Sequence, residues 1–184
     1  MIINETDGRK DQVVAVAKAM MAAARTAPKG KGTDRLEIIT LYGDDLHRLA
    51  EEMRRYSEKS GFKFFLRDAD NVEQSEAVVL LGTTYGIFNL NCGFCGFPTC
   101  VEKEKFPAVP CAFNSGDLGI AIGSAVSVAA DMRIDNRVMY SVGRAALDLG
   151  LLGECKAAYG ILLSCKGKNP YFDRVSTRSQ ETKR

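Results

Sequence analysis

Four cysteines within a twenty-residue stretch constrain this chain more than any other feature. They follow the pattern Cys-x2-Cys-x4-Cys-x10-Cys, at Cys92, Cys95, Cys100 and Cys111. A Cys-x2-Cys pair closes a tight loop whose two thiolates point at one centre, and two further thiolates within short reach complete a four-sulfur shell. The pattern therefore predicts a site for an iron-sulfur cluster or for a zinc ion.

The residues between the cysteines favour the cluster. Gly93 and Gly96 each follow a cysteine, where the missing Cβ lets the backbone turn and bring its N–H groups close to an inserted group. The sulfides of a [4Fe-4S] cluster accept such N–H groups, whereas a zinc ion carries no sulfide. Phe94, Phe97 and Pro98 are apolar, as expected of residues that shield a cluster from water. A [4Fe-4S] cluster is the favoured interpretation, and structural zinc, disulfides or unligated thiols stay open.

Composition and charge limit the remaining function classes. The 184 residues carry a net charge of +2 with 26% charged residues, which does not indicate a nucleic-acid-binding surface. Residues 1–5 contain no basic segment that leads into an apolar stretch, so a secretory signal is not predicted. The longest apolar run, Ile120 to Ala130, is too short to span a bilayer. We therefore expect a cytoplasmic protein without a membrane or nucleic-acid partner, and its reducing compartment disfavours disulfides.

The cysteine run resembles motifs of known redox proteins. The letters CGFCGFPTC are similar to the four-cysteine [4Fe-4S] motif of Rnf-type electron-transport complexes and of iron-sulfur corrinoid proteins, where the fourth cysteine usually lies further downstream than Cys111 does here. From Ala22 to about Arg174 the chain resembles the ferredoxin-domain family that carries the domain-of-unknown-function label 2148. That resemblance is most specific in the cysteine motif and in the run DNRVMY at 135–140. It implies a cluster-binding protein whose reaction is undetermined.

Hydrophobic periodicity predicts an α/β or α+β fold in which helices flank a sheet. The whole chain, 1–184, reads as one domain, with the four-cysteine segment at about 85–115 inserted in it. The helix expected after Cys111 is apolar nearly all round, which predicts a central or dimer-buried helix. The expected helices cover residues 10–27, 44–60, 115–132 and 135–149, the last capped by Asp135, and the expected strands cover 35–41, 62–67, 77–81 and 157–165.

Both ends of the pattern resemble the nitroreductase fold. The segment Ala23–Glu37 is similar to the opening of that fold, and Ala145–Leu151 is similar to its closing helix. The resemblance implies a mixed sheet flanked by helices, an FMN-binding domain and an intertwined homodimer. Nitroreductases hold the FMN phosphate with an arginine-rich N-terminal segment, whereas here only Arg9 precedes the expected helix.

Lysines near both ends of the fold are the alternative phosphate ligands. Lys29, Lys31 and Lys168 are candidate cofactor-binding residues, although a lysine acts as a point charge without the bidentate fork of an arginine. Lys29 and Lys31 also fit an ordinary solvated turn. The family resemblance adds Asn136 as a residue that lines a ligand pocket, against the alternative that it serves only helix capping and packing.

The remaining reactive side chains carry weaker signals. His47, the single histidine, falls on the polar side of its expected helix, so histidine-based acid-base chemistry is not predicted. Cys155 and Cys165 lie outside the motif and fit small core residues better than a redox role.

Three functions stay open on this basis. The first is a redox enzyme, such as a flavin-dependent nitroreductase-like oxidoreductase, in which the cluster passes electrons to a flavin or a small substrate. The second is an electron carrier that exchanges electrons with a partner protein. The third is a structural or sensory four-cysteine metalloprotein without turnover. The first two share the prediction of an iron-sulfur redox protein.

Overall fold

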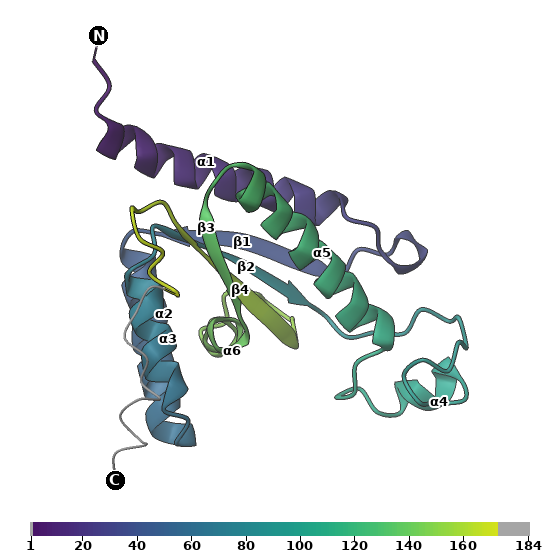
Figure 1. Ribbon diagram of the computed structural model, residues 1–184. Coiled ribbons are helices and arrows are strands. Elements are labelled where there is room, and N and C mark those ends of the chain that lie inside the picture. The colour runs from purple at the N-terminus through teal and green to yellow at the C-terminus, as the bar shows by residue number, and fades with distance from the viewer. Residues whose placement is uncertain (1, 173–184) are drawn as a thin grey trace.

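A four-stranded sheet lies between two layers of helices in the computed structural model, which describes residues 2–172 (Figure 1). The strands are β1 (Leu36–Tyr42), β2 (Ala77–Thr83), β3 (Asp135–Met139) and β4 (Ala157–Ser164), in the spatial order β1-β2-β4-β3. The predicted α+β class is confirmed, although every pairing between these strands is antiparallel where a mixed sheet was expected. The prediction of one domain over 1–184 extends beyond the described residues and stays a prediction.

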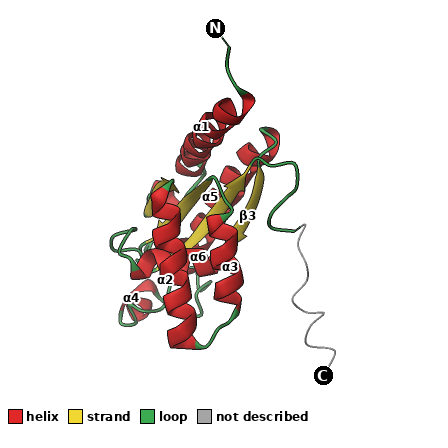
Figure 2. Ribbon diagram, turned by 90° about the vertical axis from the view of Figure 1, so that its left-hand side faces the viewer, coloured by secondary structure: helices red, strands yellow, loops and turns green. Residues whose placement is uncertain are grey.

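The two helical layers enclose separate halves of the core. Helices α1 (Glu5–Thr26) and α5 (Ala112–Asp131) cover one face of the sheet, and α2 (Asp44–Ser60), α3 (Phe64–Glu73) and α6 (Tyr140–Asp148) cover the other (Figure 2). Successive side chains of a strand point to opposite faces. In β2, Val79 and Leu81 therefore pack under α1 and α5, while Val78 and Leu80 pack under the other layer.

Two sequence predictions about the elements are wrong. The expected strand at 62–67 does not form, and helix α3 begins at Phe64 instead, because Phe65, Ala69 and Val72 recur at helical spacing and are buried against α2 and the sheet. The expected helix start at Asp135 is the first residue of β3, which pairs with Ser164 of β4, and helix α6 begins only at Tyr140. In both segments the hydrophobic pattern is too short to distinguish a helix from a strand. Contacts with the rest of the fold decide which of the two forms.

No helix within residues 2–172 combines the length and the apolar character that crossing a membrane requires.

Gly143 allows helix α6 to touch strand β4. A Cβ at this position would lie 2.0 Å from the carbonyl oxygen of Ala158, so any side chain forces the two backbones apart. We expect Gly143→Ala to lower the free energy of unfolding by about 1–3 kcal/mol in chemical denaturation. The matched control is Gly119→Ala on α5, where a Cβ meets no atom within 4 Å and alanine favours the helix. Equal stability of the two variants would contradict the close helix–strand contact.

Candidate metal centre

The loop between β2 and α5 brings the four predicted ligands together. It projects past the end of the sheet and contains the short helix α4 (Cys100–Glu104) (Figure 1). The sulfur-bearing residues Cys92, Cys95, Cys100 and Cys111 all line one small hollow, with Phe88 and Phe113 among the apolar residues around them. Their role as metal ligands stays a prediction. Cys92 and Cys111, which are nineteen positions apart in the sequence, nevertheless line the same hollow.

Two of the cysteines are buried and fixed at the starts of helices. Cys111 is the N-cap of α5, and its side chain accepts the backbone N–H of Asn114. Cys100 opens α4, and its Sγ accepts the N–H of Asn91 at 3.4 Å, while its own N–H donates to Asn91 Oδ1 at 2.8 Å. The N–H of Asn91, with those of the three residues before it, lowers the pKa of the Cys100 thiol. A thiol that ionises more easily is a better metal ligand.

The other two cysteines lie on an exposed turn. Cys92 is exposed and Cys95 is half-buried. Gly93 and Gly96 adopt the left-handed conformation, with φ of 72° and 83°, as the sequence predicts for a backbone that turns sharply around an inserted group. The N–H of Gly96 donates to the carbonyl of Gly93 at 2.9 Å and closes the turn.

Asn114 ties the two ends of the loop together. Its Oδ1 accepts the N–H of Gly86, just after β2, and the N–H of Cys111, each at 3.1 Å. The side chain is buried, and its Nδ2 has no hydrogen-bond partner among the described residues. A buried donor without a partner is costly, and Asn114 itself is not among the residues that line the hollow. The role of Asn114 in joining the loop ends was not predicted, although Cys-x2-Asn has the spacing of a capping box.

Two cations without carboxylate partners lie beside the loop. The guanidinium of Arg35 packs against the backbone of Gly86, where an added Cβ would lie 2.5 Å from Cζ, and lies 5.5 Å from the ring centre of Phe88. Lys103, one turn after Cys100 in α4, is only 2% exposed. Within residues 2–172 neither forms an ion pair. Buried charge is normally compensated, and Lys103 is a buried cation on the cysteine loop, whereas Arg35 is half-buried and donates to the carbonyl of Ile87 at 3.4 Å.

The hollow itself is tight. Its volume is about 10 Å³. No group of three or more His, Cys, Asp and Glu side chains in the described part of the chain is arranged to hold a single metal ion. A zinc ion needs its sulfurs within roughly 4 Å of one another, because each Zn–S bond is about 2.3 Å long. The four thiols thus border a common space without forming a closed shell.

Within one chain, the three lysines predicted to bind a cofactor do not lie close together. The Nζ of Lys29 donates to the carbonyls of Arg25 and Ala27 at 2.5 and 2.8 Å, so this ammonium caps the end of α1. Lys31 is exposed in a 3-10 turn (Gly30–Gly32) that precedes β1. Lys168 is exposed beyond the end of β4. Since the start of β1 and the end of β4 lie at opposite ends of the sheet, Lys168 is far from the other two.

Asn136 lies in the edge strand β3, half-buried, and its Nδ2 donates to the carbonyl of Ile134 at 3.4 Å. It lines neither the cysteine hollow nor the cavities of about 440, 350 and 180 Å³ found among the described residues. Its predicted place in a ligand pocket stays a prediction.

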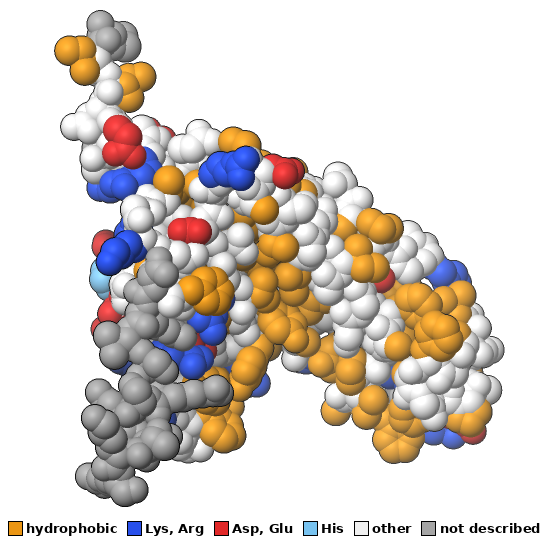
Figure 3. Space-filling model, in the orientation of Figure 1, with side chains coloured by type: hydrophobic (Ala, Val, Ile, Leu, Met, Phe, Trp, Pro, Cys, Tyr) orange, Lys and Arg blue, Asp and Glu red, His pale blue; other side chains and the backbone are white. Residues whose placement is uncertain are grey.

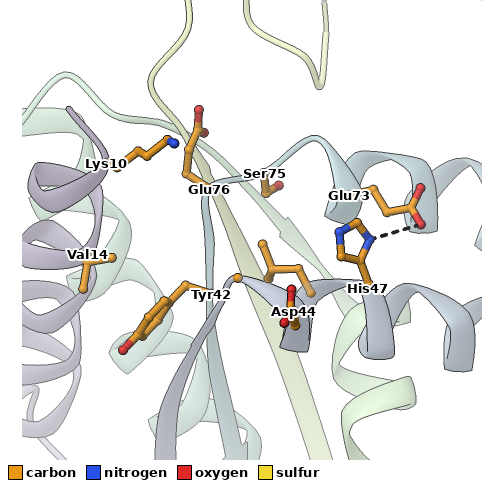
Figure 4. Close-up of a pocket in the computed structure, with 10 residues that line it drawn as sticks. Lys10, Val14, Tyr42, Asp44, His47, Glu73, Ser75 and Glu76 are labelled. Atoms are coloured by element: carbon orange, nitrogen blue, oxygen red, sulfur yellow. Dashed lines mark ion pairs between the residues drawn. The ribbon is translucent and has the colours of Figure 1, made fainter. Parts of the chain in front are cut away.

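A separate cavity of about 440 Å³ (Figure 4) lies where β1 ends and β2 begins, whereas the cysteine loop follows the other end of β2. Tyr42, His47, Glu73 and Glu76 contribute to its walls, and His47 Nδ1 lies 3.8 Å from Glu73 Oε1. The His47 side chain is mostly exposed, as predicted.

Exposed apolar side chains surround the cysteine loop. Figure 3 shows them on the lobe that carries α4 and along its inner side. The exposed members of this set are Leu90, Phe94, Val101, Phe106 and Val109. Such a surface is typical of a region that another molecule covers.

Solved structures similar to this chain define its fold class. Nitroreductase CinD from Lactococcus lactis, in complex with nicotinic acid, superposes with a TM-score of 0.60 at 14% identity, over 97% of this chain and 87% of that chain. A BluB-like flavoprotein from Clostridium difficile 630 superposes with a TM-score of 0.53 at 15% identity, over 91% of this chain and 87% of that chain. An oxidoreductase containing FMN superposes with a TM-score of 0.56 at 12% identity, over 84% of this chain and 67% of that chain. At these identities the likeness shows the fold alone, and that fold is nitroreductase-like.

Sequence relatives then define the family. Residues 108–174 match the family described as uncharacterized proteins containing a ferredoxin domain (DUF2148), a range that includes Cys111 and begins after the other three motif cysteines. An uncharacterized protein of Archaeoglobus fulgidus is 42% identical over 186 residues, which cover 95% of this chain and 98% of that protein. The chain belongs to this ferredoxin-domain family, as the sequence predicted.

Proposed function

We propose that this chain is an iron-sulfur redox protein that binds a [4Fe-4S] cluster through Cys92, Cys95, Cys100 and Cys111. The observation that carries the proposal is the shared hollow, in which four cysteines from a 20-residue stretch meet and the buried pair already accepts backbone N–H groups. Membership of a ferredoxin-domain family supports it. We further propose a cytoplasmic protein, because free thiols persist in a reducing compartment.

Different residues of the chain would contribute to cluster binding in different ways. Cys100 and Cys111, fixed at helix starts, would be the rigid half of the site. The exposed turn with Cys92 and Cys95 would have to open to admit the cluster, because the hollow measures only about 10 Å³. Asn114 keeps the loop ends together. When bound, the cluster would supply reversible one-electron chemistry. Arg35, beside the Phe88 ring that lines the hollow, would offset part of its negative charge and favour the reduced form.

A flavin is the second candidate partner of the cluster. Its support is the fold, because structures of this fold include an oxidoreductase containing FMN. Lys29, Lys31, Asn136 and Lys168 remain the proposed flavin-binding residues. Since Lys168 lies at the other end of the sheet, only a second copy of the chain would bring it near Lys29. We therefore propose a homodimer, supported by exposed small and apolar positions on α5 at Gly116, Ile120 and Gly123.

A redox titration tests the proposed function. The anaerobically purified protein is reduced with dithionite and reoxidised while its visible absorption and electron paramagnetic resonance are recorded. One reversible electron per chain, with the signal of a reduced cluster, is the expected result. A site that binds metal but takes up no electron would favour the structural or sensory role instead.

The same redox titration, carried out on variants of Arg35, tests the proposed function more specifically. Because reduction adds negative charge to the cluster, loss of a nearby cation disfavours the reduced state. We expect Arg35→Met to shift the midpoint potential of the cluster to more negative values by roughly tens of millivolts. The shift is modest because the guanidinium lies beside the Phe88 ring that lines the hollow, and solvent screens part of its charge. Arg35→Lys, which keeps the charge, should restore most of the shift. A potential unchanged in Arg35→Met would show that Arg35 serves only to pack against Gly86.

A further inference from the structure

The exposed apolar side chains on the lobe that carries α4 form a patch of functional size (Figure 3). A fully exposed phenylalanine side chain offers about 150–250 Å², so the members of the patch together present roughly 500 Å² of apolar surface. They are Leu90, Phe94, Val101, Phe106 and Val109. The largest apolar patch on a typical monomer measures about 300–600 Å² and often has a function. The lobe is therefore a candidate docking surface.

A pair of stacked rings connects this apolar patch with the cysteine hollow. Phe97 lines the hollow. Its ring lies against the ring of Phe106, with centroids 5.3 Å apart and an angle of 29° between the planes, and Phe106 is 52% exposed. Leu90 also lines the hollow and is 43% exposed. A molecule that covers the patch therefore lies one layer of side chains away from the hollow.

The size of the apolar patch limits what can cover it. Roughly 500 Å² on each partner makes an interface of about 1,000 Å² in total, which is the size of weak redox encounters, whereas obligate homodimers bury about 2,000–5,000 Å². The homodimer proposed above uses a different element, α5. The patch therefore fits a transient partner better than a second copy of this chain.

Charged side chains lie at the edge of the apolar patch. Glu102, Glu104 and Lys105 are exposed on α4 and directly after it. Within residues 2–172 none of the three forms an ion pair. An apolar centre with a polar, solvated rim is the usual composition of an interface between separately folded proteins. Both signs of charge are thus free to pair with groups of a docked protein.

We propose that the apolar patch docks a small one-electron carrier protein of the ferredoxin class, which exchanges electrons with the proposed cluster across Phe106 and Phe97. The inference rests on the proposed function and names its partner. Because a cluster takes up one electron at a time, its partner delivers single electrons and not a hydride. In the transfer the cluster of the carrier loses one electron and the cluster of this chain gains it. No bond forms or breaks, and no proton moves.

Electron transfer between plant-type ferredoxin and the cluster-loaded protein tests the docking surface. Plant-type ferredoxin is the probe, because rapid-freeze electron paramagnetic resonance distinguishes its [2Fe-2S] cluster from a [4Fe-4S] cluster. The reaction is run in the direction that the measured midpoint potentials make favourable. The disrupting variant is Phe106→Asp, which places a charge on the patch. Phe62→Asp is the matched control, because Phe62 is 53% exposed and stacks on Phe64 at 5.8 Å, outside the lobe.

We expect the rate with the natural chain to saturate as the ferredoxin concentration rises. Phe106→Asp should lower the rate at low ferredoxin concentration at least tenfold. Val101→Asp should do likewise, since Val101 is 65% exposed in the same patch. Phe62→Asp should react like the natural chain. Reduction by methyl viologen, a small reagent that needs no docking surface, should proceed equally fast in all four proteins.

Three results overturn the inference. The first is a ferredoxin rate that both patch variants leave unchanged. The second is a cluster that methyl viologen reduces but that exchanges no electron with ferredoxin. The third is a loss of the dimer in Phe106→Asp by sedimentation, which would show that a second copy covers the patch. Iron and sulfide are measured on the same samples, so a protein that carries neither refutes the proposed function itself and the inference with it.

Discussion

Replacement of Cys100 by serine is expected to abolish cluster binding. Cys100 is buried at the start of α4, and the N–H of Asn91 lowers the pKa of its thiol, so among the four proposed ligands its thiol is the one most favoured as thiolate. A serine hydroxyl is a far poorer ligand for iron. Iron and sulfide should fall from about four of each per chain to near zero, and the brown colour should be lost. Elemental analysis and visible absorption after anaerobic purification measure this.

Cys155→Ser is the matched control for this loss. Cys155 is also buried, but it packs against Gly82 and Leu152 and lies outside the cysteine loop. Burial raises the pKa of its thiol, in contrast to that of Cys100, which fits a core residue without a redox role. The control should keep its full iron and sulfide content. Cys92→Ser and Cys95→Ser should lose theirs, and an unchanged spectrum in Cys111→Ser would show that the fourth ligand is another group.

Asn114→Ala is expected to destabilise the protein and to release the cluster. The substitution removes the oxygen that accepts the N–H groups of Gly86 and Cys111, so two donors at the ends of the loop lose their partner. It also removes half of the capping box of α5. We expect the free energy of unfolding to fall by roughly 2–4 kcal/mol, since a buried unpaired donor costs about 1–3 kcal/mol and a lost cap about 1 kcal/mol.

Urea unfolding followed by far-ultraviolet circular dichroism measures the first effect, and iron content after gel filtration measures the second. Ser115→Ala is the control, because Ser115 is the next residue of α5, is exposed and caps nothing. It should behave like the natural protein. If Asn114→Ala is as stable and as iron-rich as Ser115→Ala, then Asn114 does not hold the loop.

The sequence predicted the features that depend on local pattern. The four cysteines were identified from spacing, and the left-handed turns at Gly93 and Gly96 followed from the missing Cβ. Helices α2 and α5 and strands β2 and β4 were predicted within a few residues, because each carries a long periodic or buried run. The order of these elements left the α/β and α+β classes open, and the resemblance to the nitroreductase fold favoured α+β.

The features that depend on distant contacts were not predicted. Asn114 acts through Gly86, which is 28 residues away, so no local pattern shows the pairing. The contacts of the Lys29 ammonium with the carbonyls that end α1 were likewise not predicted. The strand β3 forms because Asp135 to Met139 find backbone partners in β4, although the same letters also fit a capped helix.

The most direct measurement is the content of iron, acid-labile sulfide and zinc in protein purified under strict exclusion of oxygen. A [4Fe-4S] site predicts about four iron atoms and four sulfides per chain, with no zinc. A colourless protein that carries one zinc ion and no sulfide per chain would contradict an iron-sulfur function for this loop.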